Sequence, residues 1–139
     1  MSRGASFIAW LGLAAALAAC SAASADWTPL PAGADPPAAC ARPGESGVIE
    51  ISADNLRFSA PCMVAPANGP FVVRFTNDET EAHNVAIYAD RSLAVSYVVG
   101  DPIVGPNRTV DYPGAEFPAG DFYFLCNVHP AMDGALYVR

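Results

Sequence analysis

Short runs of alternating apolar and polar residues recur from about residue 46 to the C-terminus. β-Branched and aromatic side chains dominate these runs, and turn-forming stretches such as Pro-Ala-Asn-Gly and Pro-Ala-Gly separate them. None of the runs has the 3.6-residue period of an amphipathic helix. The pattern therefore predicts an all-β antiparallel sandwich. Its expected strands are 48–52, 56–59, 71–77, 83–88, 97–99, 108–112, 122–126 and 135–138.

Two of these runs carry residues with metal-binding chemistry on their apolar faces. Period-two alternation puts Cys126 on the same face as the two phenylalanines of 122–126. By the same rule, His83 shares a face with the aliphatic residues of 83–88. Both strands are therefore expected to direct their donors into one end of the sandwich, where apolar walls exclude water. The segment 89–106 has no strong pattern, and we expect a strand and a covering loop there without assigning it a function.

The densest chemistry lies in DFYFLCNVHPAM, which ends with Cys126, His129 and Met132 at C-x2-H-x2-M spacing. A thiolate, an imidazole and a thioether thus come from one short loop. A plane of two histidines and one cysteine with a weak axial methionine is typical of electron-transfer copper sites, whereas structural zinc uses cysteine and histidine alone. The chain has only two histidines, so His83 is the candidate for the second imidazole. The alternative interpretation is that these are ordinary core residues around a buried thiol.

The HN pair at 83–84 followed by FYFLCNVHPAMDGALYV resembles the cupredoxins, the type 1 blue copper family, over about residues 46–139. The short loop spacing is most similar to the amicyanin-like branch, because plastocyanin-like loops have a longer interval before methionine. The resemblance implies a Greek-key β-sandwich that holds one copper ion. It makes His83 the upstream ligand and Cys126, His129 and Met132 the loop ligands.

The same resemblance places Asn84 and Val128 around the ligands as supporting residues. Backbone N–H groups near a ligand sulfur withdraw electron density and favour Cu(I). Related short loops often carry proline, which lacks an N–H, at the position of Val128. We therefore expect two N–H···S contacts and a raised reduction potential, with Val128→Pro lowering it.

Residues 1–19 are typical of a secretory signal and are too short for a stable membrane span. The sequence LAAC at 17–20 is similar to the bacterial lipoprotein box, in which Cys20 becomes the lipidated first residue. The alternative is cleavage before Asp26, because the preceding Ala-Ser-Ala satisfies a small-x-small rule. Residues 20–45 are rich in Ala, Pro, Gly and Ser and predict a flexible tether, with Trp27 as its one bulky member. The cupredoxin-like domain is expected over 46–139.

Cysteine counting leaves two further residues to place once Cys20 is assigned to lipidation and Cys126 to metal. Cys40 and Cys62 are expected to form a disulfide, which an oxidising cell envelope permits. Such a bridge would pin the end of the tether to the sandwich and contribute about 3 kcal/mol. The alternative is a second metal site at Cys62 and Met63, for which no further histidine is available.

The charge balance is 7 Lys+Arg against 14 Asp+Glu, a net charge of −7, and every basic residue is arginine. This balance argues against nucleic acid as a partner. Three acidic residues just before His83, namely Asp78, Glu79 and Glu81, could form a rim that steers a basic redox partner, or could simply be a solvated turn. With both histidines assigned to metal and only one cysteine in the loop, we expect neither a catalytic site nor a binuclear copper site.

These observations together predict a mononuclear type 1 copper protein that carries single electrons between redox partners, and no enzyme. The expected partner is a redox protein such as a c-type cytochrome or an oxidoreductase. The expected location is the periplasm or cell envelope, with a monomer attached to a membrane through lipidated Cys20. The alternative function is a periplasmic copper carrier or chaperone that hands copper on without transferring electrons.

Overall fold

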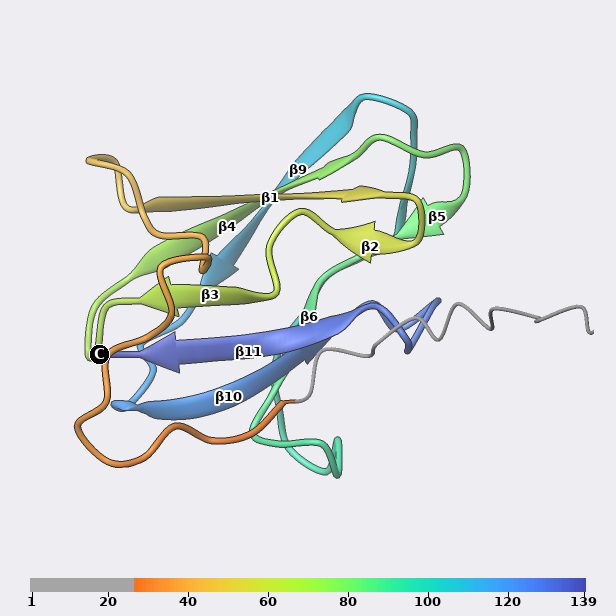
Figure 1. The fold of residues 1–139 in the computed structure, drawn as a ribbon. Coiled ribbons are helices and arrows are strands. Elements are labelled where there is room, and N and C mark those ends of the chain that lie inside the picture. The colour runs from red at the N-terminus through yellow and green to blue at the C-terminus, as the bar shows by residue number, and fades with distance from the viewer. Residues whose placement is uncertain (1–26) are drawn as a thin grey trace, which may run out of the picture.

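The computed structural model describes residues 27–139, so the predicted signal, Cys20 and the alternative cleavage site lie outside the described residues. The described chain consists of strands, turns and loops (Figure 1). Within it, no helix is long and apolar enough to cross a membrane. The first main sheet has the order β2 (Arg57–Phe58), β1 (Val48–Asp54), β4 (Phe71–Asn77) and β9 (Arg108–Gly114).

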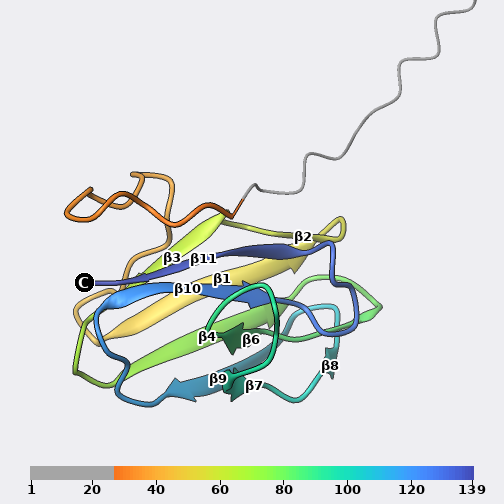
Figure 2. The same cartoon turned by 90° about the horizontal axis from the view of Figure 1, so that it is seen from below.

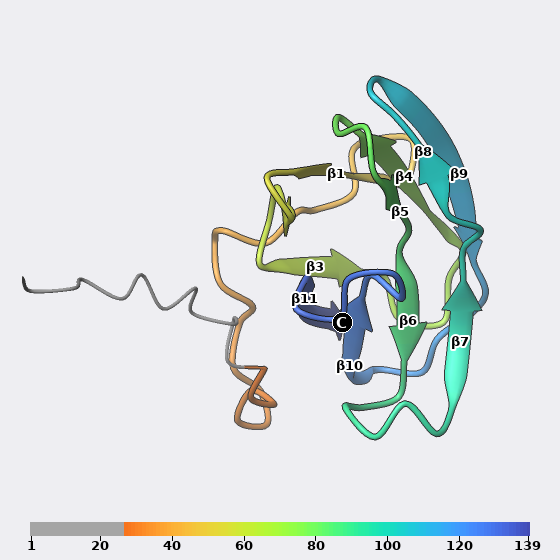
Figure 3. The same cartoon turned by 90° about the vertical axis from the view of Figure 1, so that its right-hand side faces the viewer.

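The second main sheet has the order β3 (Cys62–Ala65), β11 (Asp133–Val138), β10 (Gly120–Leu125), β6 (Ala86–Tyr88) and β7 (Ser96–Val99). A small third sheet pairs β5 (Ala82–His83) with β8 (Ile103–Val104). The two main sheets stack face to face, and β7 of the second sheet comes alongside β9 of the first (Figure 3). The all-β sandwich predicted from the sequence is confirmed. Two pairs of strands, β1 with β4 and β3 with β11, are parallel, unlike the expected antiparallel pairing throughout.

Alternation builds the core of the sandwich where one face of a strand meets solvent. In β4 every second residue is buried, so Phe71, Val73 and Phe75 point inward. The ring of Phe58 lies between the two sheets, 6.3 Å from the ring of Phe75 and 5.2 Å from the ring of Phe124. Cys126 and Met132 belong to the same buried cluster, so the candidate ligands are part of the core.

The outer face of the five-stranded sheet is covered by the N-terminal segment, residues 27–41, coloured orange in Figure 1. Trp27 donates its indole N–H to the carbonyl of Phe122 at 2.9 Å and packs edge-on against the ring of Tyr123. Farther along, the Cys40–Cys62 disulfide fastens the segment to β3. The tether predicted over 20–45 is thus only partly described, and its described part lies against the sandwich. Trp27 therefore contributes to the burial of Tyr123 on the outer face of β10, which is buried on both faces from Phe122 onward.

The strand prediction differs from the structure at two places because of tertiary contacts: one expected strand is divided, and one strand was not expected. The expected strand 83–88 is divided, because β5 leaves the main sheet to pair with β8 and only β6 pairs with β10. Strand β3 was not expected, because all four of its residues are buried and it therefore shows no alternation. The division of 83–88 brings β5 to the same end of the sandwich as the loop between β10 and β11, opposite the C-terminus (Figure 1). Its partner β8 lies at the same end in Figure 2.

Candidate metal centre

The four predicted donors come from two places in the chain. His83 is the last residue of β5, and Cys126 directly follows β10. His129 and Met132 lie in the loop that leads into β11. Within this loop the N–H of Cys126 donates to the carbonyl of Met132 at 2.9 Å, and the N–H of Met132 donates to the carbonyl of His129 at 2.8 Å. These two bonds close the loop and hold its three donors near one another.

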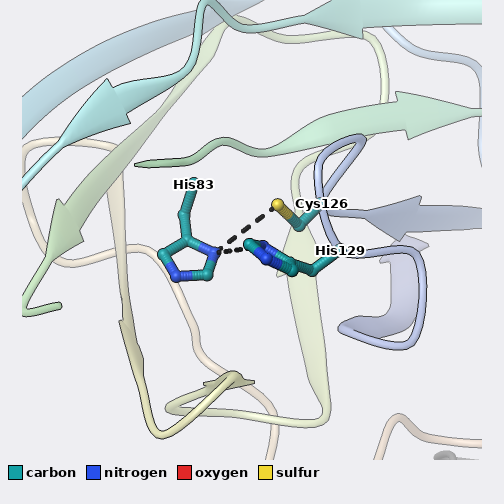
Figure 4. A group of neighbouring side chains, drawn as sticks. All are labelled: His83, Cys126 and His129. Atoms are coloured by element: carbon teal, nitrogen blue, oxygen red, sulfur yellow. Dashed lines mark hydrogen bonds between the residues drawn. The ribbon is translucent and has the colours of Figure 1, made fainter. Parts of the chain in front are cut away.

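The structure brings His83, Cys126 and His129 together (Figure 4). In the sequence, Cys126 is 43 residues and His129 is 46 residues beyond His83. Nδ1 of His83 lies 3.7 Å from Sγ of Cys126 and 3.2 Å from Nδ1 of His129. One ligand atom from each of the three residues falls within 4.8 Å of the others. His83 therefore presents Nδ1 to both the sulfur of Cys126 and the ring of His129, and the three residues together could hold a single metal ion.

Asn84 joins the two ligand-bearing segments. Its side-chain carbonyl accepts the N–H of Asn127 at 2.8 Å, directly after Cys126, and its amide donates to the carbonyl of Gly100 at 2.7 Å. The side chain is 1% exposed, so neither bond competes with water. The supporting role predicted for Asn84 thus has a geometric basis. Val128 lies in the loop and is exposed. The N–H···S contacts expected for both residues stay predictions.

The two histidines differ in their access to solvent. His83 and Cys126 are fully buried, whereas 29% of the His129 side chain is exposed. The loop residues next to His129, namely Val128, Pro130 and Ala131, are exposed as well. One edge of the donor cluster therefore reaches the surface of the protein, and the rest lies in the core.

The three acidic residues before His83 do not act alike. Glu79 is largely buried, and its Oε2 lies 3.6 Å from Nε2 of His83. Glu81 is exposed, and its Oε2 lies 3.2 Å from Nε2 of His129. Asp78 is exposed and is bonded through its N–H to the carbonyl of Ala53. The interpretation of all three as a surface rim is therefore wrong for Glu79, which points inward to the ligand histidine. No local signal in the sequence distinguishes Glu79 from its acidic neighbours, because the segment before β5 is a turn without helical periodicity.

Tyr112 supports the segment around Gly100, to which the side chain of Asn84 is hydrogen-bonded. Its hydroxyl donates to the carbonyl of Asp101 at 2.7 Å, and its ring lies against Gly100 so closely that a Cβ there would collide with it. Burial, followed by the negative charges of Asp101 and Cys126, raises the pKa of Tyr112 to about 12. The phenol therefore stays neutral and hydrogen-bonded through the physiological range.

The chemistry of this donor set fits copper better than zinc. A thiolate and imidazoles suit both ions, but a buried methionine in the same loop is a soft donor that structural zinc sites do not use. Among the described residues, Cys126 is the free cysteine, and the predicted Cys40–Cys62 disulfide is formed. Cys62 is therefore not available for a second metal site.

No family model matches the chain, and no curated protein matches it. Solved structures do. The dithionite-reduced auracyanin of Roseiflexus castenholzii is 20% identical, with a TM-score of 0.61 over 69% of this chain and 99% of that one. Auracyanin A, a "blue" copper protein of Chloroflexus aurantiacus, is 20% identical, with a TM-score of 0.55 over 66% of this chain and 98% of that one. A reduced amicyanin variant is 21% identical, with a TM-score of 0.52 over 69% of this chain and 86% of that one. At these identities the likeness concerns the fold.

Proposed function

We propose that this chain, which has the cupredoxin fold, binds one copper ion and carries single electrons between redox proteins. The observation that supports the proposal most directly is the convergence of one ring nitrogen from each histidine and one thiol sulfur within 4.8 Å at one end of the sandwich. Copper, when bound, supplies a one-electron couple between Cu(I) and Cu(II). The donor set has the mixed softness that suits both oxidation states.

Each ligand residue then has a distinct task. Cys126 would hold the copper through its thiolate, which would give the bound ion its colour, and His83 and His129 would supply the imidazole donors. Met132, buried in the same loop, would supply a soft thioether donor that favours Cu(I). Because all four donors are buried in the core or belong to a hydrogen-bonded loop, the protein is expected to hold them in place as the charge changes. Little rearrangement is expected, which favours fast electron exchange.

The surface around His129 is the proposed point of electron exit and entry. His129 is the partly exposed donor, and Pro130 and Ala131 beside it are small and exposed, so a partner could approach closely. A small interface of this kind suits a transient redox complex. Glu81 and the net charge of −7 favour a basic partner, such as a c-type cytochrome, over an acidic one.

We also propose an extracytoplasmic location, in the periplasm or cell envelope. The support is the signal-like segment 1–19 and the Cys40–Cys62 disulfide, a bond that persists in oxidising compartments. Lipidation of Cys20 would attach the monomer to a membrane, and Cys20→Ser should release it. Mass spectrometry of the mature N-terminus tests this directly, and an unmodified Asp26 at that position would contradict the lipid anchor.

The decisive experiment begins with the visible and EPR spectra after addition of Cu(II), where an intense blue colour is expected. Ala131→Glu should then slow electron exchange with cytochrome c while leaving the colour and the reduction potential nearly unchanged. A copper carrier would behave differently, because its Cu(I) must leave readily for a modest chelator. Fast copper loss together with negligible electron exchange would overturn the electron-carrier proposal and favour the copper carrier.

A further inference from the structure

The buried ligand His83 has a ring nitrogen that the metal site does not use. Its Nδ1 faces Cys126 and His129, so Nε2 points away from the donor cluster. Nε2 is fully buried and, among the described residues, has no hydrogen-bond partner within bonding distance. Leaving a buried polar group unpaired costs about 1–3 kcal/mol. Nε2 of His83 therefore needs an acceptor close by.

Glu79 supplies the facing carboxylate. Its Oε2 lies 3.6 Å from Nε2 of His83, somewhat beyond the usual bonding distance of about 2.7–2.9 Å for a charge-assisted pair. Its other oxygen, Oε1, accepts the N–H of Leu56 at 2.6 Å. A hydrogen bond to His83 requires that Oε2 move closer to Nε2 while Oε1 keeps its bond to Leu56. One side chain thus faces two separate donors, a backbone N–H and a ring N–H.

Hydrogen bonds from Asn77 and close packing at Gly105 hold the backbone of Glu79 in place. Asn77 is fully buried, and its Oδ1 accepts the N–H of Glu79 at 2.9 Å. The amide of Asn77 donates to the carbonyls of Glu81 and Ile103 at 2.6 and 2.8 Å. A Cβ at Gly105 would collide with the carbonyl of Glu79, so β8 and its following turn press directly on this segment. The backbone of this segment is therefore well packed and hydrogen-bonded, and it places the carboxylate of Glu79 next to His83.

A neutral imidazole carries its proton on one nitrogen, and the other nitrogen is then free to bind metal. We propose that Glu79 is a positioning residue of the metal centre: its carboxylate holds the proton of His83 on Nε2 and leaves Nδ1 ready as a ligand. A hydrogen bond from the outer nitrogen of a ligand histidine to a carboxylate fixes the ring and raises its basicity. The inference rests on the proposed copper site for its metal readout, but its tautomer readout does not.

The first test uses the metal-free full-length protein and nitrogen NMR of its histidines at about pH 8, where unperturbed imidazole is neutral. The wild-type protein should show His83 protonated at Nε2. Glu79→Gln offers a single acceptor oxygen for the two donors, Leu56 and His83, and should shift His83 toward protonation at Nδ1. Asp78→Asn is the control, because it removes one carboxylate from the same turn without touching either histidine. It should leave the wild-type tautomer.

The second test is Cu(II) affinity, measured by competition with a chelator. Glu79→Gln should lower it about 10- to 100-fold, the usual consequence of losing such a partner, and should raise the reduction potential because a nearby negative charge is lost. Asp78→Asn should change both far less. If Glu79→Gln matches Asp78→Asn in tautomer and affinity, Glu79 does not position His83.

A third variant keeps the test valid if Glu79→Gln fails to fold. Glu79→Asp retains the charge but shortens the side chain by one methylene, so the carboxylate can no longer span Leu56 and His83. It should shift the tautomer as Glu79→Gln does, and a wild-type tautomer in Glu79→Asp would overturn the proposal. If the wild-type protein forms no blue copper site, the proposed function fails, whereas the tautomer comparison still decides the role of Glu79.

Discussion

The candidate metal centre has two unlike halves. The framework half is His83, which is fully buried, stands at the end of β5 and is flanked by Asn84 and the inward-pointing Glu79. The loop half is Cys126, His129 and Met132, which share one short hydrogen-bonded loop and reach the surface at His129. The comparison teaches how one site can be both rigid and accessible. The core fixes one imidazole before any metal arrives, and the loop brings the remaining donors to it from the surface side.

The largest expected effect is on the loop half. Cys126→Ser should abolish the blue colour completely, because a hydroxyl is a hard, neutral donor in place of a thiolate. The domain should remain folded, since serine is close to cysteine in volume and the loop bonds of this residue run through its backbone. Visible absorption and circular dichroism measure the two quantities. Loss of the fold would instead make Cys126 a structural cysteine.

The two histidines should differ strongly when copper is absent. His83→Ala opens a cavity in the core and should lower the free energy of unfolding by about 2–5 kcal/mol, as other large-to-small core substitutions do. His129→Ala, at a partly exposed position, should cost about 0.5 kcal/mol or less. Urea unfolding of the metal-free proteins checks both values. Equal destabilisation by the two substitutions would remove the distinction between framework and loop.

With copper present, the same comparison has a second form. Free imidazole added to the solution should restore a coloured site in His129→Gly, because that position is open to solvent. It should not do so in His83→Gly, where the cavity is closed. The visible spectrum decides the matter, and rescue at both positions would mean that His83 is more accessible than its burial indicates.

A smaller effect is expected where the two halves are joined. Asn84→Ala leaves the N–H of Asn127 and the carbonyl of Gly100 without their buried partner and should cost about 1–3 kcal/mol. Asn127→Ala is the matched control, since among the described residues its side chain bonds to the hydroxyl of Tyr88 at an exposed position, and its loss should change stability by about 0.5 kcal/mol or less. Thermal or urea unfolding separates them, and similar losses would show that Asn84 is not the link.

The smallest effect appears only in alkali. The pKa of Tyr112 is raised by burial to about 12, above its ordinary value of about 10 in the unfolded chain. Its contribution to stability is therefore fully present below about pH 10 and is lost as the pH rises from there toward 12. Tyr112→Phe should reduce the fall in unfolding free energy over that window. An unchanged fall would show that Tyr112 ionises normally in the folded protein.

The sequence predicted three donors that the structure brings together, His83, Cys126 and His129, because most of the relevant information is local. Cys126, His129 and Met132 are three residues apart, so any compact loop keeps them together, and His83 was the remaining histidine. The strands that alternate, such as β4, were also predicted within their bounds, because one of their faces meets solvent. Donor identity and half-buried periodicity are properties of residue type and spacing.

Only the tertiary structure decided which strands are buried on both faces and in which direction the acidic side chains before His83 point. Strand β3 is buried on both faces, since residues 27–41 lie across the sheet, and it therefore leaves no alternation in the sequence. The three acids before His83 look alike in sequence, but the turn after β4 directs Glu79 inward and leaves Glu81 in solvent. A side chain's direction follows from the backbone path and its packing partners, which lie far away in the chain. That is why the sequence determined which atoms could bind copper, and the fold determined which nitrogen of His83 faces them.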